Sequence, residues 1–401
     1  MAEVAPATFP KKTVRDVPVE GRTVLVRVDF NVPRSGGQVT DDTRILASLP
    51  TIRYLSERRA RVVLCSHLGR PNGRRVPSLS LRPLAAILEG HLGRPVAFCP
   101  DAVGPRARRT VEAMIGGDVA LLENTRFYPE EERNDPVFAR ALASLADLFV
   151  NDGFGAAHRA HASTTGVAAC LPAVAGLLLE REAVALQRLL EPGRPFVAIV
   201  GGAKVSDKIG VLHHLLPRVD RLLVGGGMAN TFLLALGYDM GRSLVEREHV
   251  PAAERLIAAA KTVGVELLLP LDLVVGNFFL READHRVVQV EQVPEEWLAL
   301  DIGPMTAERF AAACTGAATV FWNGPLGVAE WPNFAKGTAT VASAVAACAG
   351  FSVVGGGDSI AALRALGLGE RISHISTGGG ASLEYLEGRS LPGIVALEGR
   401  S

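Results

Sequence analysis

The sequence predicts an α/β fold of two domains of similar size, each a doubly wound, largely parallel sheet flanked by helices in a Rossmann-like manner. First, short β-branched runs alternate with amphipathic stretches along nearly the whole chain, which is the pattern of βαβ units. Second, 401 residues exceed the length of one ordinary domain, about 100–200 residues. Third, an amphipathic stretch that ends at Pro192-Gly193 divides the chain into two halves.

Ten β-branched runs predict the strands. In chain order they are Thr23–Phe30, Val62–Ser66, Val119–Glu123, Leu148–Asp152, Val197–Gly201, Leu222–Gly225, Val265–Leu269, Thr319–Trp322, Ser352–Val354 and Ile372–Ser376. The helices between them include Pro136–Ala146, Asp207–Leu216, Pro251–Val263, Thr338–Ala349 and Ser359–Leu366. Their ends follow helix rules, since Asp135 precedes Pro136 as an N-cap and Gly264 follows the third of these helices.

The domain boundaries follow from the dividing stretch. Residues 180–192 carry apolar side chains at helical spacing and are predicted to form a hinge helix between the domains. The first domain is then 1–179 and the second 193–386. Residues 387–401 form a tail whose apolar LPGIVAL segment has to dock on a domain surface.

Composition excludes several classes of protein. Hydrophobic residues at 48% and charged residues at 21% exclude a mainly disordered chain. Lys+Arg 42 against Asp+Glu 42 gives no net charge, so no nucleic-acid or membrane partner is expected. The five cysteines form no C-x-x-C pair, which predicts reduced thiols and a cytoplasmic protein. They are Cys65, Cys99, Cys170, Cys314 and Cys348.

In the first half, cationic and polar side chains follow the strand ends. They include Arg44, His67, Arg70, Arg126 and Arg159. Arginine binds phosphate in a bidentate manner, so this group indicates one small polyanion. Ligands of open α/β sheets bind at the carboxyl ends of the strands. The alternative interpretation is that these are ordinary surface charges in an arginine-rich chain.

In the second half, glycine runs take the same places. One GGAK and three GGG runs stand between a strand and a helix start, and Lys204 and Lys208 follow the first of them. Such turns bring backbone N–H groups to phosphate. The alternative is that the glycines only make tight turns. Asp358 is either a helix N-cap or a ligand of Mg²⁺, and Glu330 is either a ribose acceptor or a surface acid.

Common nucleotide and metal motifs do not occur. The sequence has no G-x-x-x-x-G-K-[ST] and no G-x-G-x-x-G, so a Walker-type NTPase and a dinucleotide enzyme are not indicated. His158 and His161 lack the carboxylate pattern of a zinc site.

Nine long motifs, in order and over nearly the whole chain, resemble the phosphoglycerate kinase family. They are RVDFNVP (Arg27–Pro33), SHLGRP (Ser66–Pro71), ENTRFYPEEE (Glu123–Glu132), NDGFGAAHRAHAS (Asn151–Ser163), VGGAKVSDKI (Val200–Ile209), GGGMANTF (Gly225–Phe232), WNGPLGVAEW (Trp322–Trp331), GGGDS (Gly355–Ser359) and STGGGASLEYLEG (Ser376–Gly388). The resemblance implies reversible phosphoryl transfer from 1,3-bisphosphoglycerate to Mg-ADP, giving 3-phosphoglycerate and ATP. It also implies a monomer and a tail that returns to the first domain.

The resemblance also implies the site residues. The phosphoglycerate site would comprise Asp29, Phe30, Asn31, Arg44, His67, Leu68, Gly69, Arg70, Arg126 and Arg159. The nucleotide site would comprise Gly202, Lys204, Lys208, Gly226, Gly227, Asn323, Glu330, Gly356, Gly357, Asp358 and Ser359, with Asp358 on Mg²⁺. Arg44, Lys204, Gly379 and Gly380 would meet the transferred phosphoryl group. Ala299 replaces a glycine near the adenine of some members and is left off the site.

No general base is expected in this reaction. The carboxylate that accepts the phosphoryl group has a reference pKa of about 4 and is ionised at neutral pH. Catalysis then depends on charge neutralisation and alignment, with hinge-bending closure that excludes water. The alternative function is a non-catalytic nucleotide-binding protein on the same fold.

Overall fold

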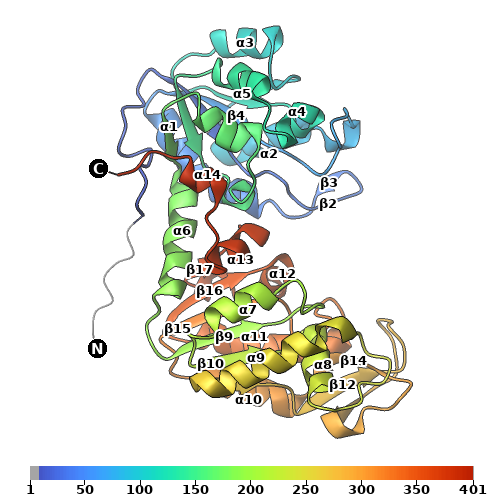
Figure 1. Ribbon diagram of the computed structural model, residues 1–401. Coiled ribbons are helices and arrows are strands. Elements are labelled where there is room, and N and C mark those ends of the chain that lie inside the picture. Colours follow the sequence, from blue (N-terminus) through green and yellow to red (C-terminus); the bar gives the residue numbers. More distant parts are fainter. Residues whose placement is uncertain (1–8, 401) are drawn as a thin grey trace. The chain divides into compact units, whose positions relative to one another are not determined.

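The computed structural model describes residues 9–400, which form two compact units (Figure 1). The N-terminal unit comprises residues 9–184 with 390–400, and the C-terminal unit comprises residues 185–389. Residues 1–8 and 401, at the ends of the predicted first domain and tail, lie outside the described residues. Within the described part, no helix has the length and apolar character to span a membrane.

The N-terminal unit is built on a six-stranded sheet in which every neighbouring pair is parallel. The order is β5 (Val96–Cys99), β6 (Val119–Leu122), β4 (Arg61–Cys65), β1 (Thr23–Arg27), β7 (Leu148–Asn151) and β8 (Ala173–Ala175). Its main helices are α1 (Thr43–Glu57), α2 (Arg82–Leu92), α3 (Pro105–Glu112), α4 (Pro129–Glu132) and α5 (Pro136–Ala143). Strands β1, β6 and β7 are buried along their whole length, as expected of a parallel sheet covered on both faces.

The C-terminal unit repeats this architecture. Its parallel sheet has the order β11 (Glu266–Leu268), β10 (Arg221–Val224), β9 (Phe196–Val200), β15 (Thr319–Asn323), β16 (Phe351–Gly355) and β17 (His374–Ile375). Its helices are α7 (Ile209–Leu215), α8 (Gly226–Ala235), α9 (Val250–Val263), α10 (Pro304–Cys314), α11 (Lys336–Ala347), α12 (Gly357–Ala365) and α13 (Gly380–Leu386). The strand order reverses between β9 and β15, and ligands of such sheets bind in the crevice at that point.

The predicted fold class is confirmed, and each of the ten predicted strands is present. The sequence interpretation missed an antiparallel sheet of β13 (His285–Gln289), β12 (Asp272–Gly276) and β14 (Leu298–Ile302). Strand β13 is mostly exposed and therefore lacks the apolar run of a buried strand. The edge strands β5 and β8 and the short hairpin of β2 (Arg34–Ser35) and β3 (Gln38–Val39) were missed as well.

Helix α6 (Leu177–Leu190) crosses from one unit to the other, whose boundary lies at Val184 and Ala185. It begins before the predicted start at Glu180, because a residue distant in the sequence caps its first turn. The buried Asp152 carboxylate accepts from the backbone N–H groups of Leu178 and Leu179 at 2.9 and 3.3 Å. Such a cap satisfies N–H groups that have no partner inside the helix.

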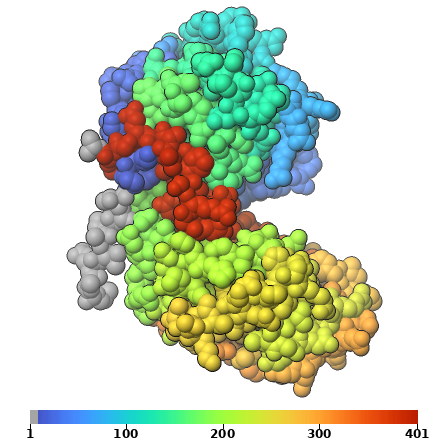
Figure 2. Space-filling view, in the orientation of Figure 1, coloured from blue at the N-terminus to red at the C-terminus, as the bar shows by residue number. Residues whose placement is uncertain are grey.

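The C-terminal segment, residues 390–400, packs on the N-terminal unit, where Figure 2 shows it in red on the surface of that unit. The backbone N–H of Gly393, in α14 (Pro392–Val395), donates to the carbonyl of Ala157 at 2.8 Å. The Asn151 amide donates to the carbonyl of Gly393 at 2.9 Å. The segment therefore contacts the loop that follows β7.

Candidate functional site

The carboxyl edge of the N-terminal sheet gathers charged and polar side chains that were predicted for the site in the first half. Asp29 follows β1, His67 follows β4, and Arg126 lies in the 3₁₀ turn η2 (Thr125–Phe127) after β6. Arg159 follows β7. Parallel strands end at the same edge of a sheet, so residues far apart in the sequence share one site.

Arg44, in the first turn of α1, is oriented by Asp29. Its Nη1 donates to the Asp29 carboxylate at 2.9 Å and to the Asn31 carbonyl at 3.1 Å. Burial raises the pKa of Asp29, but the positive charges of Arg44 and Arg27 outweigh that effect and leave this pKa below its usual value. Asp29 is therefore ionised at neutral pH. Its charge holds the half-exposed guanidinium in place for a ligand.

His67 lies beside a buried arginine that the sequence interpretation missed. Arg27 is 1% exposed, and its Nη2 lies 3.0 Å from His67 Nδ1. Burial lowers the pKa of His67 well below its usual value, and the nearby arginines lower it further against the opposing charge of Asp29. The ring is therefore neutral at pH 7. An arginine at the end of the apolar run TVLVR was the available sequence signal for Arg27.

Arg126 fixes the loop that follows β4. Its Nη1 donates to the Gly69 carbonyl at 2.8 Å, and its Nε lies 3.1 Å from Glu132 Oε1. The backbone N–H of Gly69, at φ +63°, donates to the Asn31 amide oxygen at 2.9 Å. Arg126 is buried, Arg159 is half-buried and Arg70 is exposed. The edge thus offers guanidinium groups at several depths.

Two predicted contact residues have buried side chains. Phe30 and Leu68 are 0% and 2% exposed and pack in the core of the N-terminal unit. The backbone N–H of Phe30 already donates to Ser66 Oγ at 2.9 Å, and that of Leu68 donates to the Asn124 amide oxygen at 3.2 Å. Both residues shape the edge from behind.

Three loops of the C-terminal unit interlock at the point where its strand order reverses. The backbone N–H of Gly201 donates to the Asn323 carbonyl at 2.9 Å, and that of Gly202 donates to the Pro325 carbonyl at 2.8 Å. The N–H of Met228 in α8 donates to the Gly202 carbonyl at 3.0 Å. The glycines permit these approaches, because a Cβ on Gly201 would lie 2.2 Å from the Pro325 oxygen.

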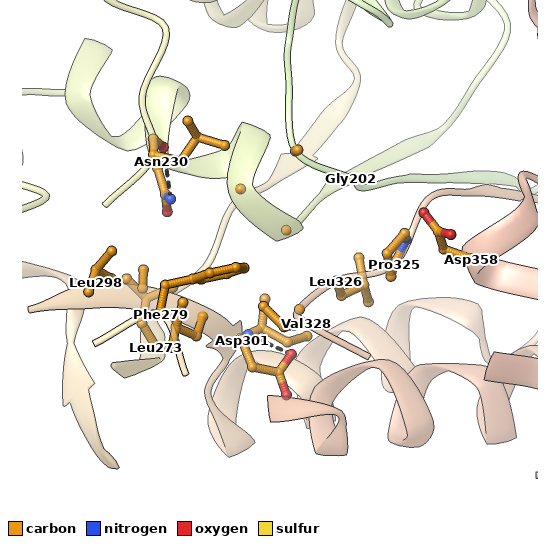
Figure 3. Close-up of a pocket in the computed structure, with 18 of the residues that line it drawn as sticks. Gly202, Asn230, Leu273, Phe279, Leu298, Asp301, Pro325, Leu326, Val328 and Asp358 are labelled. Carbon is orange, nitrogen blue, oxygen red and sulfur yellow. Dashed lines mark hydrogen bonds between the residues drawn. The ribbon is translucent and has the colours of Figure 1, made fainter. Parts of the chain in front are cut away.

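A cavity of about 260 Å³ opens beside these loops (Figure 3). Its lining is mainly apolar, with a few polar groups, as is typical of small-molecule sites. The lining residues are Gly202, Ala203, Gly226, Gly227, Asn230, Leu244, Leu273, Phe279, Leu298, Ala299, Leu300, Asp301, Ile302, Pro325, Leu326, Gly327, Val328, Glu330 and Asp358. The antiparallel sheet supplies one wall, including Leu273 and Leu298, which Figure 3 shows near Phe279.

Part of the predicted nucleotide set lines this cavity. Gly202, Gly226, Gly227, Glu330 and Asp358 do so. Ala299, which the sequence interpretation left off the site, lines the cavity. The rest of the apolar wall, such as Leu273 and Leu298, was missed because it depends on the sheet that the sequence did not reveal. The remaining predicted residues are not lining residues: Lys204, Lys208, Asn323, Gly356, Gly357 and Ser359.

Lys208 is the N-cap residue of α7 and its ammonium group bonds to the Asn323 side chain. Burial lowers the pKa of Lys208 to about 8, against the opposing charges of Asp207 and Asp358. The exposed Lys204 lies in the same loop. Both lysines therefore stand next to the glycine loops rather than in the cavity wall.

The GGGDS segment begins helix α12. Its N-cap is Gly356, so Asp358 in the first turn is an exposed carboxylate and not the cap. The buried Ser359 accepts from the backbone N–H of Gly324 at 2.7 Å and joins two loops of the site. Gly379, at φ +54°, is the N-cap of α13 and Gly380 is its first residue.

The glycine loops give a test of the site's architecture. We expect Gly226→Ala to lower the melting temperature and to weaken nucleotide binding. Gly226 has φ +66°, and a Cβ there would lie 2.7 Å from the Pro325 oxygen. Gly264→Ala is the matched control, since Gly264 has φ +74° but open space around its Cβ position. The control is expected to lose only the stability that this backbone conformation costs a non-glycine residue, about 1–2 kcal/mol. Equal losses in both variants would contradict this account.

Comparisons with known proteins point to one family. The family model described as Phosphoglycerate kinase matches residues 14–389. The chain is 59% identical to phosphoglycerate kinase of Moorella thermoacetica over 96% of this chain and 99% of that protein. It is 57% identical to the Thermomicrobium roseum protein of the same name, with the same coverage. Phosphoglycerate kinase structures from Coxiella burnetii and Pyrococcus horikoshii match with TM-scores of 0.86 and 0.87 at 42% and 34% identity, each over 96% of this chain and 98% of theirs.

Proposed function

The chain belongs to the phosphoglycerate kinase family, and from this premise we propose how its two units divide the reaction. It is a phosphotransferase with a carboxyl group as acceptor. The reaction is the reversible transfer of a phosphoryl group between 1,3-bisphosphoglycerate and ADP. The residues whose loss would have indicated the non-catalytic alternative are present: Arg44, Lys204, Lys208 and Asp358.

We assign the phosphoglycerate to the carboxyl edge of the N-terminal sheet. The observation that supports this is the concentration of guanidinium groups there, with Arg44 held by Asp29 and Arg126 held by the Gly69 carbonyl. Guanidinium groups match phosphate and carboxylate oxygens in pairs. Asn31, His67, Arg70 and Arg159 complete the proposed set.

We assign the nucleotide to the cavity of the C-terminal unit. Its apolar wall suits a base, and we assign the exposed Glu330, a lining residue, to the ribose hydroxyls. The glycine loops and Lys208 are assigned to the phosphates. Among the lining residues of Figure 3, Asp358 is an exposed carboxylate. It fits Mg²⁺, which binds through few protein carboxylates plus phosphate oxygens.

The chemistry asked of the protein is alignment and charge neutralisation. We assign Arg44, Lys204 and the N–H groups at Gly379 and Gly380 to the phosphoryl group in transfer, where positive charge and N–H donors stabilise the transition state. No residue has to remove a proton, because the acceptor carboxylate is already ionised. Bending at α6 is the proposed closing motion, and it would exclude water from the acyl phosphate.

We further propose a cytoplasmic monomer. The five cysteines carry free thiols, as expected of a reducing compartment. The monomeric state stays a prediction from the family resemblance.

The low pKa of Lys208 predicts how nucleotide affinity depends on pH. Lys208 loses its proton as the pH rises through about 8, whereas bound phosphate favours the charged form and raises this pKa. The dissociation constant of ADP is therefore expected to rise above pH 8, by at most about tenfold per pH unit. Calorimetry from pH 7.5 to 9 in buffers of different ionisation enthalpy should show proton uptake on binding. A dissociation constant that is flat over this range would contradict the assignment.

The division of substrates is tested by two variants in equilibrium binding. Arg126→Ala is expected to weaken the binding of 3-phosphoglycerate about tenfold or more and to leave the affinity for ADP unchanged. Glu330→Ala is expected to weaken the binding of ADP about fivefold and to leave the affinity for 3-phosphoglycerate unchanged. If either variant weakened both ligands equally, or the wrong one, the assignment of ligands to units would be overturned.

A further inference from the structure

Behind the arginine-lined edge of the N-terminal unit runs a chain of buried hydrogen bonds that no step described so far uses. Arg27 Nε donates to Ser163 Oγ at 2.8 Å, and Ser163 Oγ donates to Glu131 Oε1. Ser163 lies in the π-helical turn η4 (Ala162–Gly166), and Glu131 lies in α4. Ser163 and Glu131 are both 0% exposed.

Glu131 is fully engaged from the protein side. Its Oε2 accepts from the backbone N–H of Ser163 at 3.0 Å, and its Oε1 also accepts from Thr125 Oγ1 at 3.2 Å. The carboxylate therefore joins η4 to the turn that carries Arg126. These hydrogen bonds hold the buried carboxylate in place. Its negative charge balances the positive charge of Arg27, to which Ser163 connects it.

At its other end the chain fixes the tautomer of His67. Arg27 Nη2 lies 3.0 Å from His67 Nδ1. A guanidinium group only donates, so Nδ1 has to accept and the proton of the neutral ring has to be on Nε2. Asp29 Oδ1, at 3.9 Å from Nδ1, is too far to take a proton from it in a hydrogen bond.

The charges around His67 favour the neutral ring. The groups that act on it are the guanidiniums of Arg27, Arg126 and Arg44 and the carboxylate of Asp29. Burial lowers the pKa of His67, and the three cations together with burial outweigh the single anion. The Nε2–H group is then a hydrogen-bond donor without net charge.

We propose that Ser163 is a positioning residue of the phosphoglycerate site. With Glu131 it orients Arg27, and Arg27 holds His67 as the neutral tautomer whose Nε2–H is presented to the substrate. The assignment of that substrate rests on the proposed function, whereas the tautomer does not. A neutral donor selects for an oxygen acceptor by direction, while the arginines supply the charge. Since the ring stays neutral, the charge of His67 does not change between pH 6 and 8, and substrate binding in this range does not depend on its titration.

The first test is a direct measurement on the unmodified chain. Histidine-selective ¹⁵N labelling resolves the tautomer and protonation of each of the nine histidines, and His67→Gln identifies the resonances of His67 by their loss. We expect an unprotonated Nδ1 and a protonated Nε2 at every pH from 6 to 8. A ring with the proton on Nδ1, or one that titrates near pH 6.5, would overturn the proposal.

The second test separates positioning from stability. Ser163→Ala is compared with Thr165→Ala, whose hydroxyl lies in the same turn and bonds the His161 carbonyl. In Ser163→Ala we expect a partly protonated His67 at pH 6 and a KM for 3-phosphoglycerate raised about fivefold, with the KM for ATP unchanged. In Thr165→Ala both quantities should stay as in the unmodified chain. A lower melting temperature with His67 and both KM values unchanged would show a purely structural role.

The two proposals fail in different ways. If the unmodified chain had the expected tautomer but no turnover with 3-phosphoglycerate, the assignment of the substrate would be wrong and the positioning chain would stand. If turnover were present and His67 titrated normally, the positioning proposal would be wrong and the function would stand.

Discussion

Arg44→Ala is expected to lower kcat by about 10³–10⁵-fold, the range found for arginines that stabilise a phosphoryl group in transfer. Arg44 stands in the first turn of α1, and its guanidinium is held by Asp29 at 2.9 Å and by the Asn31 carbonyl. Both hydrogen bonds orient the side chain without a bound ligand. The measurement is kcat at saturating ATP and 3-phosphoglycerate.

Two further variants control this experiment. Arg53→Ala removes an exposed arginine of the same helix that donates to the His91 carbonyl, and its kcat should stay within about twofold of the unmodified chain, as for most surface substitutions. Arg44→Lys keeps the positive charge but lacks the planar guanidinium group. Its kcat should therefore lie between those of Arg44→Ala and Arg53→Ala. If kcat of Arg44→Ala stayed within a few-fold of the unmodified value, the role assigned to Arg44 would be wrong.

The second large effect is expected for Lys208→Met. The kcat/KM for ATP should fall about 10- to 150-fold, because the variant loses the proposed charge-assisted hydrogen bond from a half-buried ammonium group to phosphate. The melting temperature should hold or rise, since burial of the ammonium group already opposes its charged form. Loss of activity without loss of stability would identify a binding group.

The matched control is Lys261→Met, which replaces an exposed lysine of α9. It should leave both the activity and the melting temperature unchanged. A fall in the melting temperature of Lys208→Met that accounts for the lost activity would mean that Lys208 holds the loop together, chiefly through Asn323, instead of binding phosphate.

Much of the fold could be predicted because parallel strands buried on both faces form apolar runs that are visible in the sequence. The antiparallel sheet was missed for the opposite reason, since β13 is exposed and β14 mixes Asp301 with apolar residues. That omission had a consequence for the site. The part of the apolar wall formed by Leu273 and Leu298 comes from this sheet, so no motif of the sequence revealed it.

The polar residues of the site were easier to predict than their surroundings. Arg126 lies in the ENTRFYPEEE motif, which follows a strand, and Arg44 lies in the first turn of the helix after the first strand. Arg27 also lies in a motif, RVDFNVP, but it was missed because its role depends on its burial and on partners from distant segments. Phe30 shows the reverse case, since the motif drew attention to a side chain that packs in the core. Burial and partners are properties of the folded chain.

The most direct test of the whole account is turnover by the unmodified chain. Mg²⁺-dependent formation of ADP from ATP would be followed with and without 3-phosphoglycerate, in a coupled assay that removes the acyl phosphate. We expect a rate in the range of about 10 to several hundred per second that requires 3-phosphoglycerate. No rate above background, with ADP binding intact, would contradict the account and favour a nucleotide-binding protein without catalysis.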